Sequence, residues 1–298
     1  MQQKKQIING FLNIYKEVGV SSNQTLGALK KILHPKKIGH GGTLDVMAEG
    51  VLPVALGEAT KTLQFILDSD KEYEFTLEWG YETDTFDLEG KITQKSNHIP
   101  TIKELKEAIK NFTGEIDQIP PVYSALKFNG KNAYQLAREG KDIDMSIKKR
   151  KVNIYSLELL SQAGNLTTFK AKVSKGTYIR TLGIDIARSL NSCATIIKLI
   201  RTKTKSFNKN SSISVKRLDE LLKTSHNIND LLLNVDIVLA NIPVFIASEL
   251  EEQALNNGQI KFKLNDIGLF RVYNQTNTLL SIVENDGSQI KILRNFNL

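Results

Sequence analysis

The sequence predicts an α+β fold with a small β-rich domain at its C-terminal end. Helical and strand-like periodicities both occur, but they do not alternate as strict βαβ units. A length of 298 residues suits one large domain with one small domain. Near residue 242 the character changes to short apolar runs, 268–273 and 279–283, with Asn-Gly and Asp-Gly turn signals. The predicted domains are therefore residues 1–241 and residues 242–298.

The large domain is predicted to begin with a strand and a helix. Residues 10–15 favour a short strand, and Ser21-Ser22 offers an N-cap for a helix. Pro35 lies just beyond the predicted end of that helix. Residues 36–50 hold several glycines without periodicity, which predicts a loop. The apolar stripe of the helix is formed by Leu26, Leu29 and Leu33.

The remaining elements follow from periodicity and capping signals. Residues 58–67 predict a helix, and residues 73–79 alternate like a strand with one buried face. Thr101 and Glu104 form a capping box that opens another helix. Further elements are predicted as strands at 151–160, 166–174 and 195–200, and a helix at 180–190.

Composition indicates a cytoplasmic protein with a polyanionic partner. The net charge is +8 and the pI about 9.3, and lysines gather in residues 30–37, 148–151 and 198–209. Such clusters favour contacts with nucleic acid phosphates, although a single run would be an ordinary solvated face. No apolar stretch is long enough for a membrane span, and the N-terminus lacks the apolar core of a signal peptide. Cys193 is the sole cysteine, which excludes an internal disulfide and suits a reducing compartment.

The segment richest in candidate chemistry is the glycine cluster at residues 39–53, which contains Asp45. Glycines at 39, 41 and 42 permit unusual backbone conformations and close approach of a ligand. Asp45 on such a loop is either an exposed, positioned carboxylate or an Asx-type turn residue, and the residues alone leave both open. The spacing of glycines and lysine does not match a P-loop. No histidine or cysteine pattern predicts a metal site.

Six segments together are similar to the TruB family of pseudouridine synthases. Residues 39–53 resemble the family's signature around a catalytic aspartate. The resemblance implies a pseudouridine synthase fold, with a mixed, largely antiparallel central sheet flanked by helices and a PUA-like C-terminal domain. The other five segments follow in the family's order at residues 57–61, 71–73, 83–90, 118–127 and 174–181.

The resemblance also implies an activity and its partners. It implies isomerisation of uridine to pseudouridine at position 55 in the T loop of tRNA, without cofactor or metal. The expected partner is the T arm of tRNA, and the protein is expected to act as a monomer without an obligatory protein partner. An enzyme that acts on a base within folded RNA must extrude it and hold it by stacking and edge contacts.

Six residues receive roles by carry-over from the family. Asp45 is implied as the catalytic aspartate, and Arg180 as its ion-pair partner. Without the resemblance, Tyr73 and Leu199 would be ordinary core residues and Arg180 a surface ion-pair residue, whereas His40 among glycines is less easily explained as core. Near the flipped nucleotide the family implies His40 beside it, Tyr73 stacked on the uracil, and Tyr178 and Leu199 lining the pocket.

An aspartate suffices for the implied chemistry because uridine and pseudouridine are isomers. The bond from ribose to N1 breaks, the uracil turns, and a bond from ribose to C5 forms, so no group or electron is supplied from outside. A carboxylate can act as nucleophile or stabilise positive charge on the sugar. The atom that it attacks and the base that removes the C5 proton stay open at this point.

Two departures and three alternatives accompany the resemblance. Glu17 and Val46 replace prolines usual in the family, which predicts a less rigid loop around Asp45. One alternative is a non-catalytic RNA-binding protein on the same scaffold. A uridine methyltransferase would instead need a cysteine nucleophile, for which Cys193 lacks a motif. The third is a guide-RNA-dependent relative, which the absence of a long basic tail disfavours.

Overall fold

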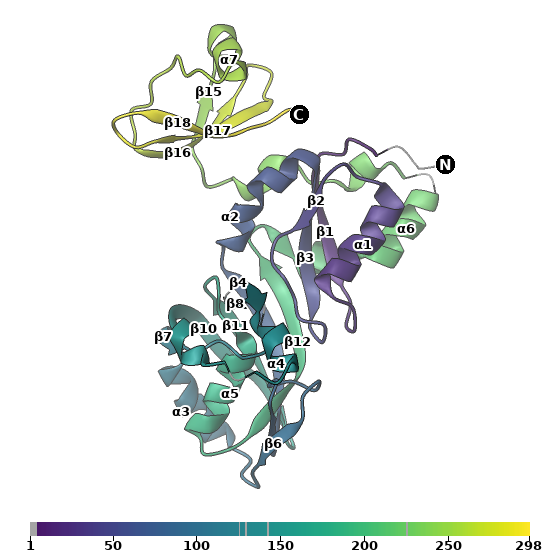
Figure 1. Cartoon of the computed structure of the whole chain (residues 1–298), viewed down its shortest axis with the longest axis vertical. Coiled ribbons are helices and arrows are strands. Elements are labelled where there is room, and N and C mark those ends of the chain that lie inside the picture. Colours follow the sequence, from purple (N-terminus) through teal and green to yellow (C-terminus); the bar gives the residue numbers. More distant parts are fainter. Residues whose placement is uncertain (1–4, 125, 129, 142, 225) are drawn as a thin grey trace.

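The computed structural model describes residues 5–298 apart from positions 125, 129, 142 and 225. Ala125, within the segment 118–127 quoted above, therefore lies outside the described residues. The chain forms an elongated body with a central sheet, and a separate small sheet near the C-terminus lies at one end (Figure 1). Among the described residues, no helix is long and apolar enough to span a membrane.

A ten-stranded sheet of the described chain forms the centre of the large body. Its main path is β14-β1-β3-β12-β4-β11-β10-β7, with β2 paired to β3 and β13 paired to β12. Only the pairs β1–β14 and β3–β12 are parallel among these described strands, so the predicted mixed, largely antiparallel sheet is confirmed. The strands are β1 Gly10–Lys16, β2 Ile38–His40, β3 Glu49–Leu56, β4 Lys71–Trp79, β7 Gly114–Gln118, β10 Arg150–Ala163, β11 Leu166–Val173, β12 Ala194–Thr204, β13 Phe207–Asn208 and β14 Ile213–Ser214.

Helices and short hairpins surround this sheet. Helix α1 begins at Ser21, whose side chain accepts from the backbone N–H of Gln24 in a capping box, and it ends at His34 in the left-handed region. The predicted capping box of Thr101 and Glu104 opens α3. The helices are α1 Ser22–Leu33, α2 Leu63–Leu67, α3 Ile102–Asn111, α4 Ala133–Arg138, α5 Ile179–Ser189 and α6 Val215–Lys223, and the hairpins are β5 Tyr81–Thr83 with β6 Ile92–Lys95 and β8 Lys127–Phe128 with β9 Lys131–Asn132.

Two predictions for the N-terminal third were wrong in part. The predicted loop at 36–50 contains β2 and the first residues of β3. The predicted helix at 58–67 is a 3₁₀ turn, Gly57–Thr62, followed by the short α2. In that turn the hydroxyls of Thr60 and Thr62 each donate to the carbonyl three residues earlier, which fits the tighter winding.

The core anchors the loop that carries Asp45. Leu44 and Ala48, on either side of it, are 4% and 0% exposed and pack in the cluster beneath α5 and α3. Figure 1 shows α3 and α5 beside the β10–β11 end of the sheet, while α1 and α6 lie together at its other end. The loop joins the paired strands β2 and β3, and its residues Leu44 and Ala48 pack into the part of the core that lies beside α3 and α5.

The C-terminal segment forms its own four-stranded sheet, β15-β16-β17-β18. Its core includes Leu255, Val272 and Val283. Leu279 and Phe296 pack instead against the large body, so the two parts share an apolar contact. The elements are β15 Val244–Ile246, α7 Glu249–Asn256, β16 Gly268–Tyr273, β17 Leu279–Asn285 and β18 Ile290–Asn295.

Candidate active site

The Asp45 loop joins β2 to β3 and is held at its base by hydrogen bonds. The backbone N–H of Leu44 donates to Ser22 Oγ at 2.9 Å, and this hydroxyl lies 3.2 Å from the Leu44 carbonyl, to which it donates. Gly19 N–H donates to the Val46 carbonyl at 3.0 Å. Val46, which stands where the family usually has proline, is therefore bonded to the turn between β1 and α1. This bond offsets the lower rigidity expected from the missing proline.

The glycines of this segment serve two different purposes. Gly42 and Gly50 have φ values of 118° and 109°, which side chains rarely allow. A Cβ on Gly50 would also lie 2.3 Å from the carbonyl oxygen of Arg201. Gly39 and Gly41 do not have positive φ; added Cβ atoms there would meet the side chains of α2 at 2.7 and 2.6 Å. The expectation of unusual conformations at 39 and 41 was therefore wrong, and close packing explains both.

Two buried cations hold the loop from beneath. Arg201 is 1% exposed and donates from Nε to the Val51 carbonyl at 2.8 Å and from a terminal nitrogen to the Gly42 carbonyl at 2.9 Å. Lys16 is fully buried, and its Nζ donates to the carbonyls of Glu17 and Ala48. Burial lowers the pKa of Lys16 to about 8, and the negative charge of Asp45 opposes that shift. Lys16 was not singled out from sequence, and Arg201 was expected within the basic group at 198–209 to face phosphates, which its burial contradicts.

Replacing Lys16 by Met should loosen the Asp45 loop. The carbonyls of Glu17 and Ala48 lose a donor, and an unmade buried hydrogen bond costs about 1–3 kcal/mol. We also expect turnover to fall at least about tenfold, because small displacements of a reacting group are costly. Denaturant midpoints and turnover of the Lys16→Met protein test this; unchanged values of both would show that the ammonium does not hold the loop.

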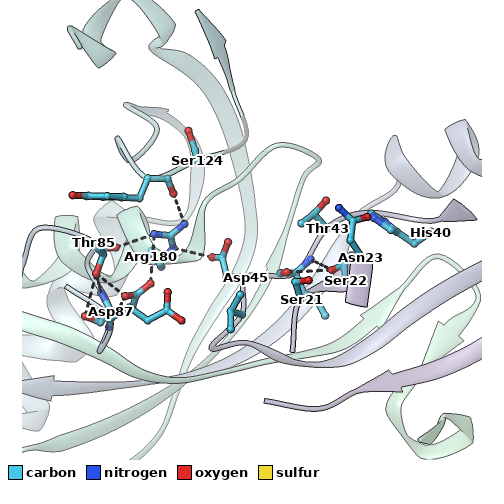
Figure 2. A pocket seen from close by; sticks show the side chains of 14 residues that line it. Ser21, Ser22, Asn23, His40, Thr43, Asp45, Thr85, Asp87, Ser124 and Arg180 are labelled. Atoms are coloured by element: carbon cyan, nitrogen blue, oxygen red, sulfur yellow. Dashed lines mark hydrogen bonds and ion pairs between the residues drawn. The ribbon is translucent and has the colours of Figure 1, made fainter. Parts of the chain in front are cut away.

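Asp45 faces the guanidinium of Arg180. Arg180 Nε lies 2.8 Å from Asp45 Oδ2, and the two side chains are 5% and 42% exposed, respectively. This Nε makes no aligned hydrogen bond, so the contact is an ion pair that holds the carboxylate electrostatically. One carboxylate oxygen of Asp45 thus lies against a buried cation, while the rest of the carboxylate is accessible to solvent. Figure 2 shows Asp45 between the Arg180 cluster and the side chains of the α1 N-terminus.

Arg180 is itself fixed by partners from two other segments. Its terminal nitrogens donate to the carbonyls of Thr85 at 2.9 Å and Tyr123 at 2.8 Å, and one lies 3.5 Å from Asp87 Oδ2 (Figure 2). Asp87 is 3% exposed, and its Oδ1 accepts from Thr85 Oγ1 at 2.6 Å. The buried charge of Arg180 is therefore shared between a buried and a half-exposed carboxylate.

A cavity of about 280 Å³ opens beside this pair. His40 is half-buried on its wall; its Nδ1 is buried without a hydrogen-bond partner, and burial lowers the imidazole pKa, with nearby Arg201 adding to the shift. The neutral ring is therefore favoured. Ser124 Oγ is likewise buried and unpartnered among the described contacts. The described lining is Ser21, Ser22, Asn23, His40, Thr43, Leu44, Asp45, Val46, Thr85, Asp87, Glu89, Tyr123, Ser124 and Arg180.

Of the six residues predicted for the site, the described lining of this cavity contains His40, Asp45 and Arg180. The other three lie on adjoining elements and outside that lining. Tyr73 on β4 is half-buried and pairs with Arg201 of β12, the residue beneath the loop. Leu199 on β12 is 5% exposed and belongs to the core, and Tyr178 precedes α5. Among the described residues, none of these three forms a hydrogen bond or ion pair with Asp45 or Arg180.

Sequence reasoning missed the partners of Arg180. Segment 83–90 contributed only to the resemblance, and no role was given to Thr85, Asp87 or Tyr123. The available signal was a Thr-x-Asp-x-Glu pattern in which Asp87 Oδ1 accepts from both Thr85 and the backbone N–H of Glu89, a local turn that leaves Oδ2 for a cation.

In the second half of α5, Asp185 should make stability depend on pH. Burial raises its pKa to about 6; Arg188 opposes the shift and Glu82 adds to it. The folded chain thus binds this proton more tightly than the unfolded chain, so the contribution is favourable at acidic pH and is lost as the pH rises to about 6. We expect Asp185→Asn to raise the melting temperature by a few degrees at a pH of about 8 and much less at about 4. Equal shifts at both pH values would contradict this.

The chain is similar in sequence to proteins of a known family. Residues 30–179 match the N-terminal domain of the TruB family of pseudouridylate synthases. The chain is 40% identical over 295 residues to the tRNA pseudouridine synthase B of Zymomonas mobilis, covering 97% of this chain and 96% of that protein. The corresponding protein of Rickettsia akari is also 40% identical, with 97% and 99% covered.

Solved structures share the fold at lower identity. A crystal structure of a Cbf5-Nop10-Gar1 complex contains a chain that aligns with a TM-score of 0.71 at 22% identity, covering 97% of this chain and 86% of that one. An H/ACA ribonucleoprotein bound to a substrate RNA containing 2′-deoxyuridine gives a TM-score of 0.70 at 23% identity, with 93% and 78% covered. The central sheet, its helices and the separate C-terminal sheet therefore form a known arrangement.

Proposed function

The chain belongs to the TruB family of pseudouridylate synthases, and on that basis we propose that it isomerises uridine 55 in the T loop of tRNA. In this proposal the target nucleotide is flipped out of the RNA, and the carboxylate of Asp45 is the reacting group. The tRNA substrate is supported by the name of the relatives, tRNA pseudouridine synthase B. The basic net charge of +8 suits a polyanionic substrate.

One observation carries the proposal: the carboxylate of Asp45 lies at a cavity wall, 2.8 Å from a buried guanidinium. Asp45 is 42% exposed, so an incoming nucleotide can reach it, whereas Arg180 is 5% exposed and is held by the carbonyls of Thr85 and Tyr123. Asp45 would stabilise the positive charge that develops on the ribose as its bond to N1 breaks. Alternatively, the carboxylate would attack the sugar as that bond breaks and form a covalent adduct. Neither route requires a cofactor, since product and substrate are isomers.

The pocket for the extruded base is proposed to extend from the cavity to the adjoining strands. His40, with its neutral ring favoured, would lie against the nucleotide, and Tyr73 would stack on the uracil. Tyr178 and Leu199 would complete the apolar wall. Stacking of a base on an aromatic side chain is worth roughly 1–3 kcal/mol, which offsets part of the cost of unstacking it from the RNA.

We propose that residues 242–298 form a PUA-like domain that binds tRNA away from the target base. Lys261 and Lys263 are exposed on this domain, and each phosphate contact that is lost weakens binding in a salt-dependent way. The double variant Lys261→Glu/Lys263→Glu should therefore raise the KM for tRNA several-fold with little change in kcat. A fall in kcat with unchanged KM would contradict this division of labour.

The activity is tested by incubating tRNA with the purified protein alone, without added cofactor, guide RNA or protein partner. Pseudouridine mapped by sequencing should be found at position 55 of an unmodified tRNA transcript. Binding without any pseudouridine would favour the alternative of a non-catalytic RNA-binding protein. Modification only after addition of a guide RNA and partner proteins would favour the guide-dependent alternative.

A further inference from the structure

Tyr178 is held from two sides by residues of neighbouring strands. Gln118, at the end of β7, is 0% exposed; its Nε2 donates to the Tyr178 carbonyl at 3.0 Å, and its Oε1 accepts from the Tyr178 N–H at 2.7 Å. Arg150, at the start of β10, places its guanidinium carbon 4.8 Å from the centre of the Tyr178 ring. The backbone of Tyr178 and its ring are therefore fixed by different side chains.

These two side chains are direct partners across the sheet. In the antiparallel pairing of β7 and β10, Gln118 lies opposite Arg150. A terminal nitrogen of Arg150 donates to the Gly176 carbonyl, while its Nε is buried and has no hydrogen-bond partner. The guanidinium is thus oriented by the tyrosine ring and the turn before it, so that the pair and Tyr178 form one packed unit.

The unit formed by Gln118, Arg150 and Tyr178 lies next to Arg180, the ion-pair partner of Asp45. Gln118 and Arg150 flank residues 119–149, an inserted segment with six lysine or arginine residues against three acidic ones. Tyr178 is the N-cap residue of α5, and Arg180 follows two positions later. The same segment reaches Arg180 directly, because the Tyr123 carbonyl accepts from it. The residues at both ends of this basic segment therefore contact the start of α5, the helix whose Arg180 pairs with Asp45.

We propose that Gln118 and Arg150 are positioning residues for the isomerisation, acting through Tyr178. The proposal rests on the function proposed above, in which the Tyr178 ring lines the pocket for the flipped base. Gln118 fixes the backbone position from which the Tyr178 ring projects, and Arg150 fixes the orientation of the ring by covering one face. Neither needs to touch the RNA. A planar guanidinium suits this task, because it stacks on an aromatic face while its N–H groups bond elsewhere.

The first test is the rate of a single turnover at saturating tRNA, measured beside the tRNA dissociation constant. Gln118→Met removes both bonds to Tyr178 and keeps the length of the side chain, and Arg150→Met removes the planar cation. We expect either change to slow the bound turnover about 10- to 100-fold, as misplacement of contact groups does. The dissociation constant should change by less than about threefold, since few contacts with RNA are lost.

Gln118→Glu provides a sharper readout. The carboxylate still accepts from the Tyr178 N–H but cannot donate to its carbonyl, whereas the protonated acid can do both. Relative to the unmutated protein at the same pH, its turnover should recover as the pH is lowered from about 8 to about 6. A residue that merely stabilised the fold would shift the melting temperature without this pH-dependent recovery.

Two matched controls accompany these variants. Gln162 lies near the far end of β10 and donates to the carbonyl of Pro100, and Arg217 on α6 makes an exposed ion pair with Glu220. Gln162→Met and Arg217→Met should leave bound turnover within about twofold of the unmutated rate.

The outcomes separate this proposal from the function itself. Unmutated protein that forms no pseudouridine would contradict the proposed function. Active unmutated protein with normal turnover in Gln118→Met and Arg150→Met would overturn the positioning role alone. Weakened tRNA binding with normal bound turnover in Arg150→Met would also overturn it, because Arg150 would then act as an RNA contact.

Discussion

The Asp45→Asn protein should bind tRNA normally and form pseudouridine at less than about one thousandth of the unmutated rate. The amide has nearly the shape of the carboxylate, but it is a poor nucleophile and cannot stabilise a developing positive charge. The ion pair with Arg180 is lost as well, although Arg180 retains the carbonyls of Thr85 and Tyr123. Turnover under single-turnover conditions and tRNA affinity are the measurements.

Stability provides the control for this variant. Asp45 is 42% exposed, and ion pairs this accessible contribute less than about 1 kcal/mol. The melting temperature should therefore change little, so a loss of activity cannot be attributed to unfolding. Pseudouridine formation at the unmutated rate would show that another group performs the reaction.

Replacing Arg180 by Met should damage both stability and activity. Asp87 is 3% exposed and faces Arg180, and removing one partner from a buried charge pair costs about 3–5 kcal/mol. The carbonyls of Thr85 and Tyr123 also lose their donor. Asp45 would lose the cation that orients it, so turnover per folded molecule should drop at least about a hundredfold. Chemical denaturation and single-turnover rates measure the two effects.

The double variant Arg180→Met/Asp87→Asn separates these effects. An amide at position 87 removes the unpaired buried charge, so part of the lost stability should return. Activity should not return, because Asp45 still lacks its guanidinium partner. Full recovery of turnover in the double variant would mean that Arg180 serves only to neutralise Asp87.

Local signals predicted the elements that begin with caps or alternate clearly. Helices α1 and α3 were found through Ser21 and Thr101, and β4 through its alternating pattern. Strand β3 was missed because seven of its eight residues are buried, which erases alternation, and because Pro53 argues against a central strand. In the fold the Pro53 carbonyl accepts from the Gly41 N–H at 2.8 Å, so this residue keeps one backbone hydrogen bond although it has no N–H to donate.

The candidate site likewise contains residues that the sequence predicted and residues that it did not. Asp45 stood out because an acid on a glycine-rich loop is locally unusual, and the resemblance supplied Arg180. The residues that fix the pair could not be found locally: Asp87 comes from the β5–β6 hairpin, Tyr123 from the insertion, and Lys16 from the end of β1. Their convergence depends on the order of strands in the sheet, which no short pattern encodes.

The distance between residue 45 and the target ribose tests the central claim most directly. A structure of the Asp45→Asn protein bound to a T-arm RNA would hold unreacted substrate in place. We expect the side chain of residue 45 to contact the sugar of an extruded uridine at roughly 3–3.5 Å, the spacing of groups poised to react. A uridine that remains stacked in its loop, or a ribose well out of reach of residue 45, would contradict the account.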